Sequence, residues 1–287
     1  MRQARRPLFP LLAALASAFV LLPAGAWAAA PEAPVVRGAD AAMARVLADP
    51  RRDRDRARDA ARHPAETLAF FRIAPGMTVA DYMPAGGWYT RILVPYLGEG
   101  GHYIGLGPGL AAASAGTKQR YADFASRFPV SAAGWTGEAE SRISAFTLDA
   151  VPAERRGVVD RVIIMREVHN MWPGNLLTPD LAAIRALLKD DGLLGIEEHR
   201  ARPDAPADYT LGDKGYLREA DVIALVEAHG FRLVGKSEVN ANPQDTADWP
   251  DGVWTLPPSL ALKDKDRAKY EAIGESDRMT LLFAKRR

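Results

Sequence analysis

Short apolar runs alternate with amphipathic stretches along the chain from about residue 77 onward. We expect strands over seven of these runs, at 77–82, 102–106, 143–148, 160–165, 192–197, 232–239 and 279–284. Apolar residues at helical spacing predict helices at 89–97, 115–127, 179–189 and 219–229. Strands separated by helices need crossover connections, so the pattern predicts an α/β fold with a mainly parallel sheet covered on both faces.

The two ends of this region depart from the alternation. Residues 33–62 are rich in Ala, Arg and Asp, and alternating charge of this density is typical of a solvated helix face. We expect one or two helices there, continuing through 64–73. Near the other end, a long connection with several Pro and Trp residues precedes the final strand, which is therefore expected to lie antiparallel. Trp249 and Trp254 in this connection either cap a ligand site or pack onto the sheet.

The first 28 residues have the order of an export signal. Arginines at positions 2, 5 and 6 precede an apolar run over 8–22, and the small residues at 26–28 resemble a cleavage site. The run is short for a membrane span and contains Pro10, so an uncleaved anchor is the less favoured alternative. We expect a signal peptide over 1–28, a helical extension over 29–62 and the main domain over 63–287. The mature protein is then periplasmic, without stable membrane insertion.

Composition excludes several classes of site. The chain has no cysteine, which removes disulfides, thiolate metal sites and a cysteine nucleophile. Its 37 basic and 36 acidic residues nearly balance, so the charge gives no reason to expect nucleic acid as a partner.

The stretch ADYMPAGGWYT, residues 80–90, follows the first predicted strand. Ligands of open parallel sheets bind at the carboxyl ends of the strands. Gly86 and Gly87 let the backbone approach a ligand closely, and a helix that starts near Gly87 directs free amide groups toward it. A nicotinamide oxidoreductase is disfavoured, because the three-glycine fingerprint is missing and no acidic residue follows the second strand.

This stretch also carries a family resemblance. Residues 81–87 resemble the first motif of class I S-adenosylmethionine-dependent methyltransferases, and PAGGWYTRIL is similar to the PGGGWYT loop of a family of predicted bacterial methyltransferases, many of them exported. RHPAETLAFF, REVHNMW, GYLREADVIALVEAHGF and NPQDT also resemble this family, from about residue 57 to the C-terminus. The resemblance implies a Rossmann-like, three-layer sandwich whose seven-stranded sheet is mainly parallel with an antiparallel last strand.

The resemblance implies that the cofactor, S-adenosyl-L-methionine, lies against this loop. Asp81 orients the loop and contacts the amino-acid part of the cofactor, whose methionine moiety Gly86 and Gly87 face. The expected cofactor-binding residues are Asp81, Pro84, Ala85, Gly86, Gly87, Tyr89, Leu106 and Glu167. Two departures weaken this match: Met83 and Ala85 stand where the superfamily has glycine, and Leu106 offers no carboxylate to the ribose.

Polar residues also follow the fourth and fifth strands. After the fourth, His169 is the candidate base that accepts a proton from the methyl acceptor, and Asn170 is the candidate to hold that acceptor. Trp172 stacks either beside the acceptor or against the sulfonium in this interpretation. The alternative for His169 is a structural histidine bonded to the backbone.

The fifth strand ends in Glu197, Glu198, His199 and Arg200. We expect no metal there, because adjacent strand residues point to opposite faces and the two carboxylates should not converge. His199 and Arg200 are expected to line the substrate site. His63 belongs either to an N-terminal lid or to a helix boundary.

Two functions fit these patterns. One is a methyltransferase that transfers a methyl group in line to a small molecule. The other is a catalytically inactive, exported protein of the same fold that binds a small ligand or a partner, and the weakened cofactor motif favours this alternative.

Overall fold

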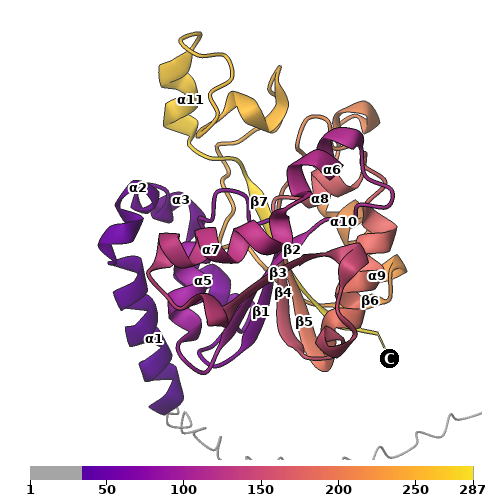
Figure 1. Cartoon of the computed structure of the whole chain (residues 1–287). Helices are drawn as coiled ribbons and strands as arrows, with labels where there is room; N and C mark the ends of the chain where they lie inside the picture. Colours follow the sequence, from indigo (N-terminus) through magenta and orange to yellow (C-terminus); the bar gives the residue numbers. More distant parts are fainter. Residues whose placement is uncertain (1–33, 287) are drawn as a thin grey trace, which may run out of the picture.

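The computed structural model describes residues 34–286, which form a sheet with helices on both faces (Figure 1). The predicted signal peptide, residues 1–28, lies outside the described residues. The strands are β1 (Thr78–Tyr82), β2 (His102–Gly107), β3 (Ile143–Thr147), β4 (Val159–Met165), β5 (Leu188–His199), β6 (Phe231–Ser237) and β7 (Arg278–Lys285). The α-helices are α1 (Pro34–Leu47), α2 (Asp53–Arg56), α3 (Asp59–Arg62), α4 (Pro64–Phe70), α5 (Thr90–Leu97), α6 (Ala115–Tyr121), α7 (Phe124–Thr136), α8 (Val168–Met171), α9 (Leu177–Leu187), α10 (Glu219–Ala228) and α11 (Arg267–Ile273). Short 3-10 turns include η1 (Pro50–Arg52) and η6 (Gly252–Thr255).

The sheet has the strand order β3-β2-β1-β4-β5-β7-β6. The first five strands of this order are parallel, and β7 runs antiparallel to both β5 and β6. All seven predicted strands and the antiparallel last strand are confirmed. The fold is the class I methyltransferase type of Rossmann-like sandwich. Its strand order reverses between β1 and β4, where ligands of such sheets bind.

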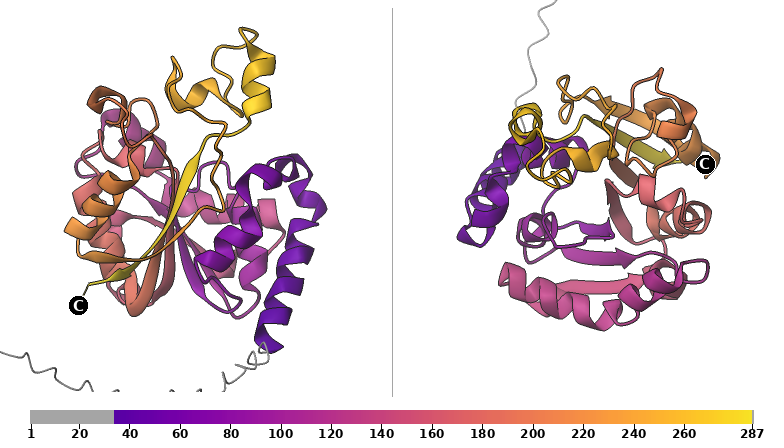
Figure 2. Two further views of the ribbon diagram at one scale, coloured as in Figure 1. Left: turned by 180° about the vertical axis from the view of Figure 1, so that it is seen from behind. Right: turned by 90° about the horizontal axis from the view of Figure 1, so that it is seen from above.

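Side chains of β1 alternate between the two faces of the sheet, and each face is covered by its own hydrophobic core. Ala80 and Tyr82 join a core under α8, α9 and α10, whereas Val79 joins a second core under α1, α4, α5 and α7. Figure 2 shows these two helical layers on opposite sides of the sheet. Asp81 lies on the Val79 side, so a carboxyl group enters an apolar layer at the carboxyl end of the central strand.

Three helix predictions need correction. The single helix expected at 115–127 is two helices, α6 and α7, that break at Ala122 and Asp123; both halves have helical spacing, so the pattern alone did not show the break. The helix expected from Gly87 begins at Thr90. The N-terminal segment is divided into several short helices, with breaks at Pro50 and Pro64, because proline cannot donate the backbone hydrogen bond that continues a helix.

The charge-rich N-terminal segment is not wholly solvated, as its composition had suggested. Arg52 is fully buried, and its guanidinium lies 2.7 Å from Asp59 and over the ring of Trp88. Arg62 is buried as well and also stacks over Trp88, at 4.8 Å. The alternating charges therefore include ion pairs turned inward, toward the β1–α5 loop.

Residues 238–277, here named the late connection, lie at one end of the molecule, beyond β7 in Figure 1. Together with Ala201, Ala205 and Tyr216 they form a small separate core. In it Trp249 packs edge-on against Tyr270, and its indole N–H donates a hydrogen bond to Asp245 at 2.7 Å. Within residues 34–286, no helix has the length and apolar character needed to cross a membrane.

Candidate active site

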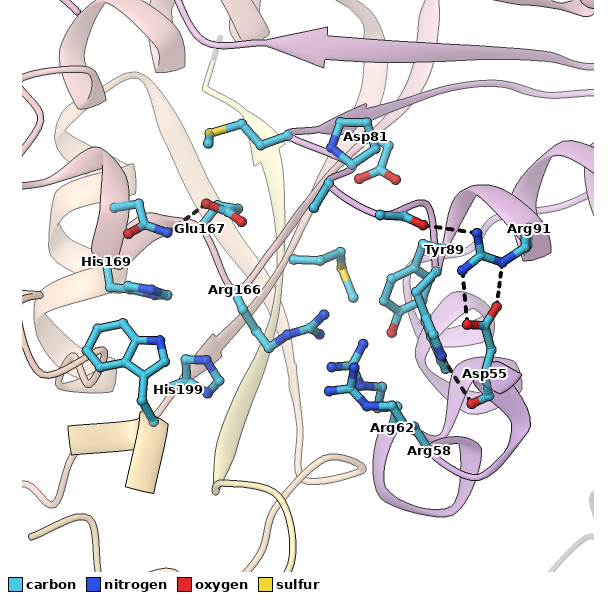
Figure 3. A pocket seen from close by; sticks show the side chains of 18 residues that line it. Asp55, Arg58, Arg62, Asp81, Tyr89, Arg91, Arg166, Glu167, His169 and His199 are labelled. Carbon is cyan, nitrogen blue, oxygen red and sulfur yellow. Dashed lines mark hydrogen bonds and ion pairs between the residues drawn. The ribbon is translucent and has the colours of Figure 1, made fainter. Parts of the chain in front are cut away.

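A cavity of about 450 Å³ opens at the carboxyl ends of β1, β4 and β5. Its walls come from the α2–α3 segment, the β1–α5 loop, the residues after β4, His199 at the end of β5 and Trp254 of η6 (Figure 3). We name it the main cavity. A side cavity of about 580 Å³ adjoins it and shares Met83, Ala85, Glu167 and Asn170 with it.

The β1–α5 loop separates these two cavities through an unusual backbone. Met83 and Ala85 have φ angles of 51° and 46°, and Gly87 has a φ of 74°. A left-handed conformation costs a residue with a side chain about 1–2 kcal/mol, and glycine adopts it freely. The loop thus has, at Met83 and Ala85, a backbone conformation that suits glycine better than the residues present.

Gly87 packs closely against Trp135 and does not form part of the wall of either cavity. A Cβ atom on Gly87 would lie 2.5 Å from the ring of Trp135, and Gly87 lines neither cavity. Pro84, Ala85 and Gly86 do line the main cavity, and space around Gly86 is open. Of the two glycines expected at the cofactor, only Gly86 lies at the cavity.

Asp81 lines the main cavity although it is almost fully buried. Burial raises the pKa of Asp81 to about 7, against the opposing effects of Tyr103, whose hydroxyl donates to it at 2.7 Å, and of Arg166. Thr90 in turn contacts the Tyr103 hydroxyl at 2.9 Å. Asp81 is therefore a carboxyl that a positively charged ligand group would ionise.

The residues after β4 supply two further groups. Arg166 has a φ of 62°, and its Nη1 donates to Glu197 at 2.6 Å. Glu167 accepts a hydrogen bond from Asn170 at 2.8 Å, and burial raises its pKa to about 7. Non-glycine residues held in the left-handed region are concentrated at functional sites.

His169 is oriented by Glu198. The ring Nδ1 lies 2.9 Å from Glu198 Oε1, and the backbone amide of His169 donates to Glu198 Oε2 at 3.1 Å. Burial lowers the pKa of His169, but the charge and hydrogen bond of Glu198 outweigh it and the net shift is upward. No residue of the described chain bonds to Nε2, so this atom remains for a ligand. A histidine fixed by a carboxylate can act as a general base.

The two glutamates at the end of β5 point apart, as expected. Glu197 faces Arg166 and Glu198 faces His169. His169, Glu198 and His199 nevertheless place possible metal-ligand atoms within 4.8 Å of one another. Each is already hydrogen-bonded, His199 through Nδ1 to Ser276 at 2.6 Å. The absence of a metal stays a prediction.

Besides Gly87, three predicted site residues lie away from the main cavity. Leu106 is buried in the core. It contacts the loop through its backbone carbonyl, which accepts a hydrogen bond from the backbone amide of Met83 at 2.8 Å. Trp172 is 37% exposed and faces a small hollow near Thr178. Arg200 pairs with Asp277 and other acidic residues outside the cavity. His63, the possible lid residue, forms the junction of α3 and α4 and does not line the cavity.

Other predicted residues do meet in the main cavity: Asp81, Pro84, Ala85, Gly86, Tyr89, Glu167, His169, Asn170 and His199. The sequence did not predict that Arg58, Arg62 and Arg166 join them. A spacing of four residues places Arg58 and Arg62 on one helical face, but a solvated helix has the same spacing, so the signal was ambiguous. Trp254 lines the cavity, whereas Trp249 packs in the late connection.

Comparisons with known proteins bear on the fold. No protein-family model and no curated protein matches the chain. Among solved structures, a SAM-dependent methyltransferase from Aquifex aeolicus is 18% identical with a TM-score of 0.46, covering 69% of this chain and 93% of its own. A putative sarcosine dimethylglycine methyltransferase from Galdieria sulphuraria is 13% identical with a TM-score of 0.49, covering 81% and 88%.

A third solved structure is 1,6-didemethyltoxoflavin-N1-methyltransferase from Burkholderia thailandensis, crystallised with bound 1,6-didemethyltoxoflavin and S-adenosylhomocysteine. It is 15% identical with a TM-score of 0.45, covering 91% of this chain and 94% of its own. At these identities the likeness concerns the fold alone, which the strand order of the sheet establishes independently.

Proposed function

We propose that the protein is an S-adenosyl-L-methionine-dependent methyltransferase that acts on a small molecule. The observation that carries this proposal is the β1–α5 loop, left-handed at Met83, Ala85 and Gly87, between two adjoining cavities of about 450 and 580 Å³. The cofactor has an amino acid at one end and a nucleoside at the other. Two spaces joined along one loop match that bipartite shape.

The amino-acid end of the cofactor fits the residues of the main cavity. Asp81, which is buried, and Glu167, which is partly buried, are carboxyls with pKa values of about 7 at its wall. An ammonium or sulfonium group nearby would ionise them. The ribose end is weaker, since Leu106 has no carboxylate. Ser114, Thr117 and Tyr121 line the side cavity and offer hydroxyl groups there.

The main cavity also holds the groups that methyl transfer requires. The bound cofactor supplies a methyl group on a sulfonium: its carbon–sulfur bond breaks with the electron pair left on sulfur, and the methyl carbon bonds to an oxygen or nitrogen of the acceptor. Nε2 of His169 takes the proton that the acceptor loses, while Glu198 holds Nδ1–H. Asn170 donates to Glu167, which leaves its carbonyl oxygen to position the acceptor.

The alternative function is an inactive, exported protein that binds a small ligand or a partner. It is favoured by the side chains that Met83 and Ala85 place on the loop and by the missing carboxylate at Leu106. Both features weaken cofactor binding without changing the fold.

Calorimetric titration with S-adenosylmethionine and S-adenosylhomocysteine separates the two functions. The test variant is Gly86→Leu, because Gly86 lines the cavity in open space and has an ordinary φ. Gly134→Leu, at an exposed α7 position with equally open space, is the matched control. We expect binding by the wild type and the control and loss of binding in Gly86→Leu. A wild type that shows no heat at millimolar ligand supports the inactive protein instead.

We further propose that residues 1–28 direct export to the periplasm and are then removed. The order of arginines, apolar run and small residues supports this. Fractionation of a bacterial host followed by N-terminal sequencing of the product tests it, and an intact N-terminus in the membrane fraction contradicts it.

A further inference from the structure

Several arginines gather around one carboxylate beside the main cavity. Glu275 lies 2.7 Å from Arg58, 3.1 Å from Arg62 and 3.1 Å from Arg278. Burial raises the pKa of Glu275, but these three guanidinium groups outweigh burial and lower it to about 2. The carboxylate is thus fully ionised, with all of its charge engaged by three partners.

Glu197 is the second carboxylate of this group. It lies 2.6 Å from Arg166 and 3.3 Å from Arg278, and its other oxygen accepts the hydroxyl of Tyr89 at 3.1 Å. Across residues 34–286, Arg58, Arg62, Arg166 and Arg278 form ion pairs with no carboxylate other than these two.

Each of these four guanidinium groups has a carboxylate partner, but four positive charges share only two negative ones, so the group carries an excess of two positive charges. Burial first, and then the charge of Arg166, lower the pKa of Arg62 to about 9. Buried positive charge that is not balanced by negative charge costs free energy. An anion that binds among these arginines removes that cost and gains charge-assisted hydrogen bonds.

The excess positive charge of these arginines faces the main cavity. Arg58, Arg62 and Arg166 line it, and Figure 3 shows the three side chains converging between Tyr89 and His199. Arg62 engages Glu275 through Nε, and within residues 34–286 no other group bonds to its two terminal nitrogens, which can therefore bind a ligand. Arg166 uses only Nη1 for Glu197.

A recess of about 100 Å³ lies beneath the late connection and shares this corner with the main cavity. Arg62, Arg166 and His199 line both spaces, and Ser259 adds a hydroxyl group to the recess. Glu275 lines the recess too, but three arginines already engage its charge. The two guanidinium groups and the hydroxyl group therefore suit a carboxylate or phosphate group.

The cofactor of the proposed function would not balance these charges. It carries a sulfonium, an ammonium and one carboxylate, so its net charge is positive. Asp81 and Glu167 are the carboxyls suited to its positive groups, and its single carboxylate neutralises at most one of the two excess positive charges. The second excess positive charge can be neutralised only by an anion from another molecule.

We propose that the main cavity takes a small anionic molecule whose carboxylate or phosphate group is held by Arg62 and Arg166, with Arg58 at the entrance. This inference rests on the proposed function in one respect: there the anionic molecule is the methyl acceptor, and its nucleophilic atom reaches His169. Acceptors without an anionic group bind poorly.

Calorimetry with inorganic phosphate as the probe, in saturating S-adenosylhomocysteine, tests the site. We expect the wild type to bind phosphate, and Arg62→Gln and Arg58→Gln to bind it at least about tenfold more weakly, which corresponds to about 1.4 kcal/mol. Both variants leave Glu275 with two arginine partners, so the fold should persist, and thermal unfolding checks this. Arg56→Gln, on the same segment but exposed and outside the cavity, is the control and should match the wild type.

Three outcomes separate the sources of the anion. No phosphate binding by the wild type, or equal binding by Arg62→Gln, overturns the proposal. If Arg62→Gln weakens S-adenosylhomocysteine but not 5′-methylthioadenosine, which lacks the carboxylate, and leaves phosphate binding intact, the arginines serve the cofactor and the proposal is overturned. If the wild type binds phosphate through Arg62 but binds no cofactor, the anion site stands and the methyltransferase function fails.

Discussion

Glu198 holds His169 at two points, through the ring Nδ1 at 2.9 Å and through the backbone amide at 3.1 Å. The same Oε1 also accepts the backbone amide of His199 at 2.8 Å. This carboxylate therefore fixes both the ring orientation and the protonated nitrogen of His169. The arrangement leaves Nε2 as the proton-accepting atom of the cavity.

Replacing Glu198 with Gln should lower the pKa of His169, because the negative charge of Glu198 is what raises it. Turnover should fall by roughly 10²–10⁴-fold, the usual contribution of general base catalysis, while S-adenosylhomocysteine affinity stays the same. In the wild type, activity should rise with pH as His169 loses its proton. NMR titration of the His169 ring and a pH–rate profile measure both effects. An unchanged His169 pKa in the variant would remove Glu198 from the mechanism.

Asp81→Asn should stabilise the protein at neutral and higher pH. Because the pKa of Asp81 is about 7 in the folded protein, above its ordinary value, the folded state binds more protons than the unfolded state between about pH 4 and 7. The free energy of unfolding of the wild type therefore falls as pH rises through this window. Asp81→Asn has no carboxyl group to ionise, so its free energy of unfolding does not fall in this way. At pH 8 it should exceed that of the wild type by up to about 4 kcal/mol.

Urea unfolding at pH 4 and pH 8 measures this difference, which should shrink at the lower pH. Tyr103→Phe serves as a second check, because it removes the hydrogen bond that lowers the pKa of Asp81. Its stability should fall more steeply with pH than that of the wild type. Equal pH dependence in wild type and Asp81→Asn would show that Asp81 is ionised in the fold.

Ala85→Gly should leave the protein as stable as the wild type or stabilise it by about 0.5–1 kcal/mol. The left-handed conformation of Ala85 costs about 1–2 kcal/mol that glycine avoids, whereas glycine adds about 0.4–1 kcal/mol of unfolded-state entropy. Ala125→Gly, at an exposed α7 position, should instead destabilise by about 1 kcal/mol. Chemical denaturation compares the two, and equal destabilisation would argue against the strained loop.

Gly87→Ala should destabilise the protein by about 2–4 kcal/mol, from the left-handed φ and from overpacking against Trp135. Gly86→Ala, one residue away in open space, should be stabilising or neutral within about 1 kcal/mol. In a protein that already carries Trp135→Ala, Gly87→Ala should destabilise only by the free energy that the left-handed φ costs alanine. A cost that persists unchanged in that background would exclude the contact with Trp135 as its source.

The sequence by itself determined the order of strands and helices and the location of the loop after β1. Periodicity is a local property, so each of the seven strands could be read from its own residues, and the Gly86-Gly87 turn marked the ligand end of β1. The same local information put His169, Asn170 and Glu167 at the end of β4, where the structure has them.

Only the tertiary structure decided which side chains meet. Arg58 and Arg62 belong to a segment whose charges are typical of a solvated helix, yet both pair with Glu275, more than 200 positions away. Glu198 contacts His169, which lies 29 positions away in the sequence, because β4 pairs with β5. Burial and ion pairing depend on contacts between distant segments, which no local pattern records, so the arginine cluster and the oriented histidine emerged only from the folded chain.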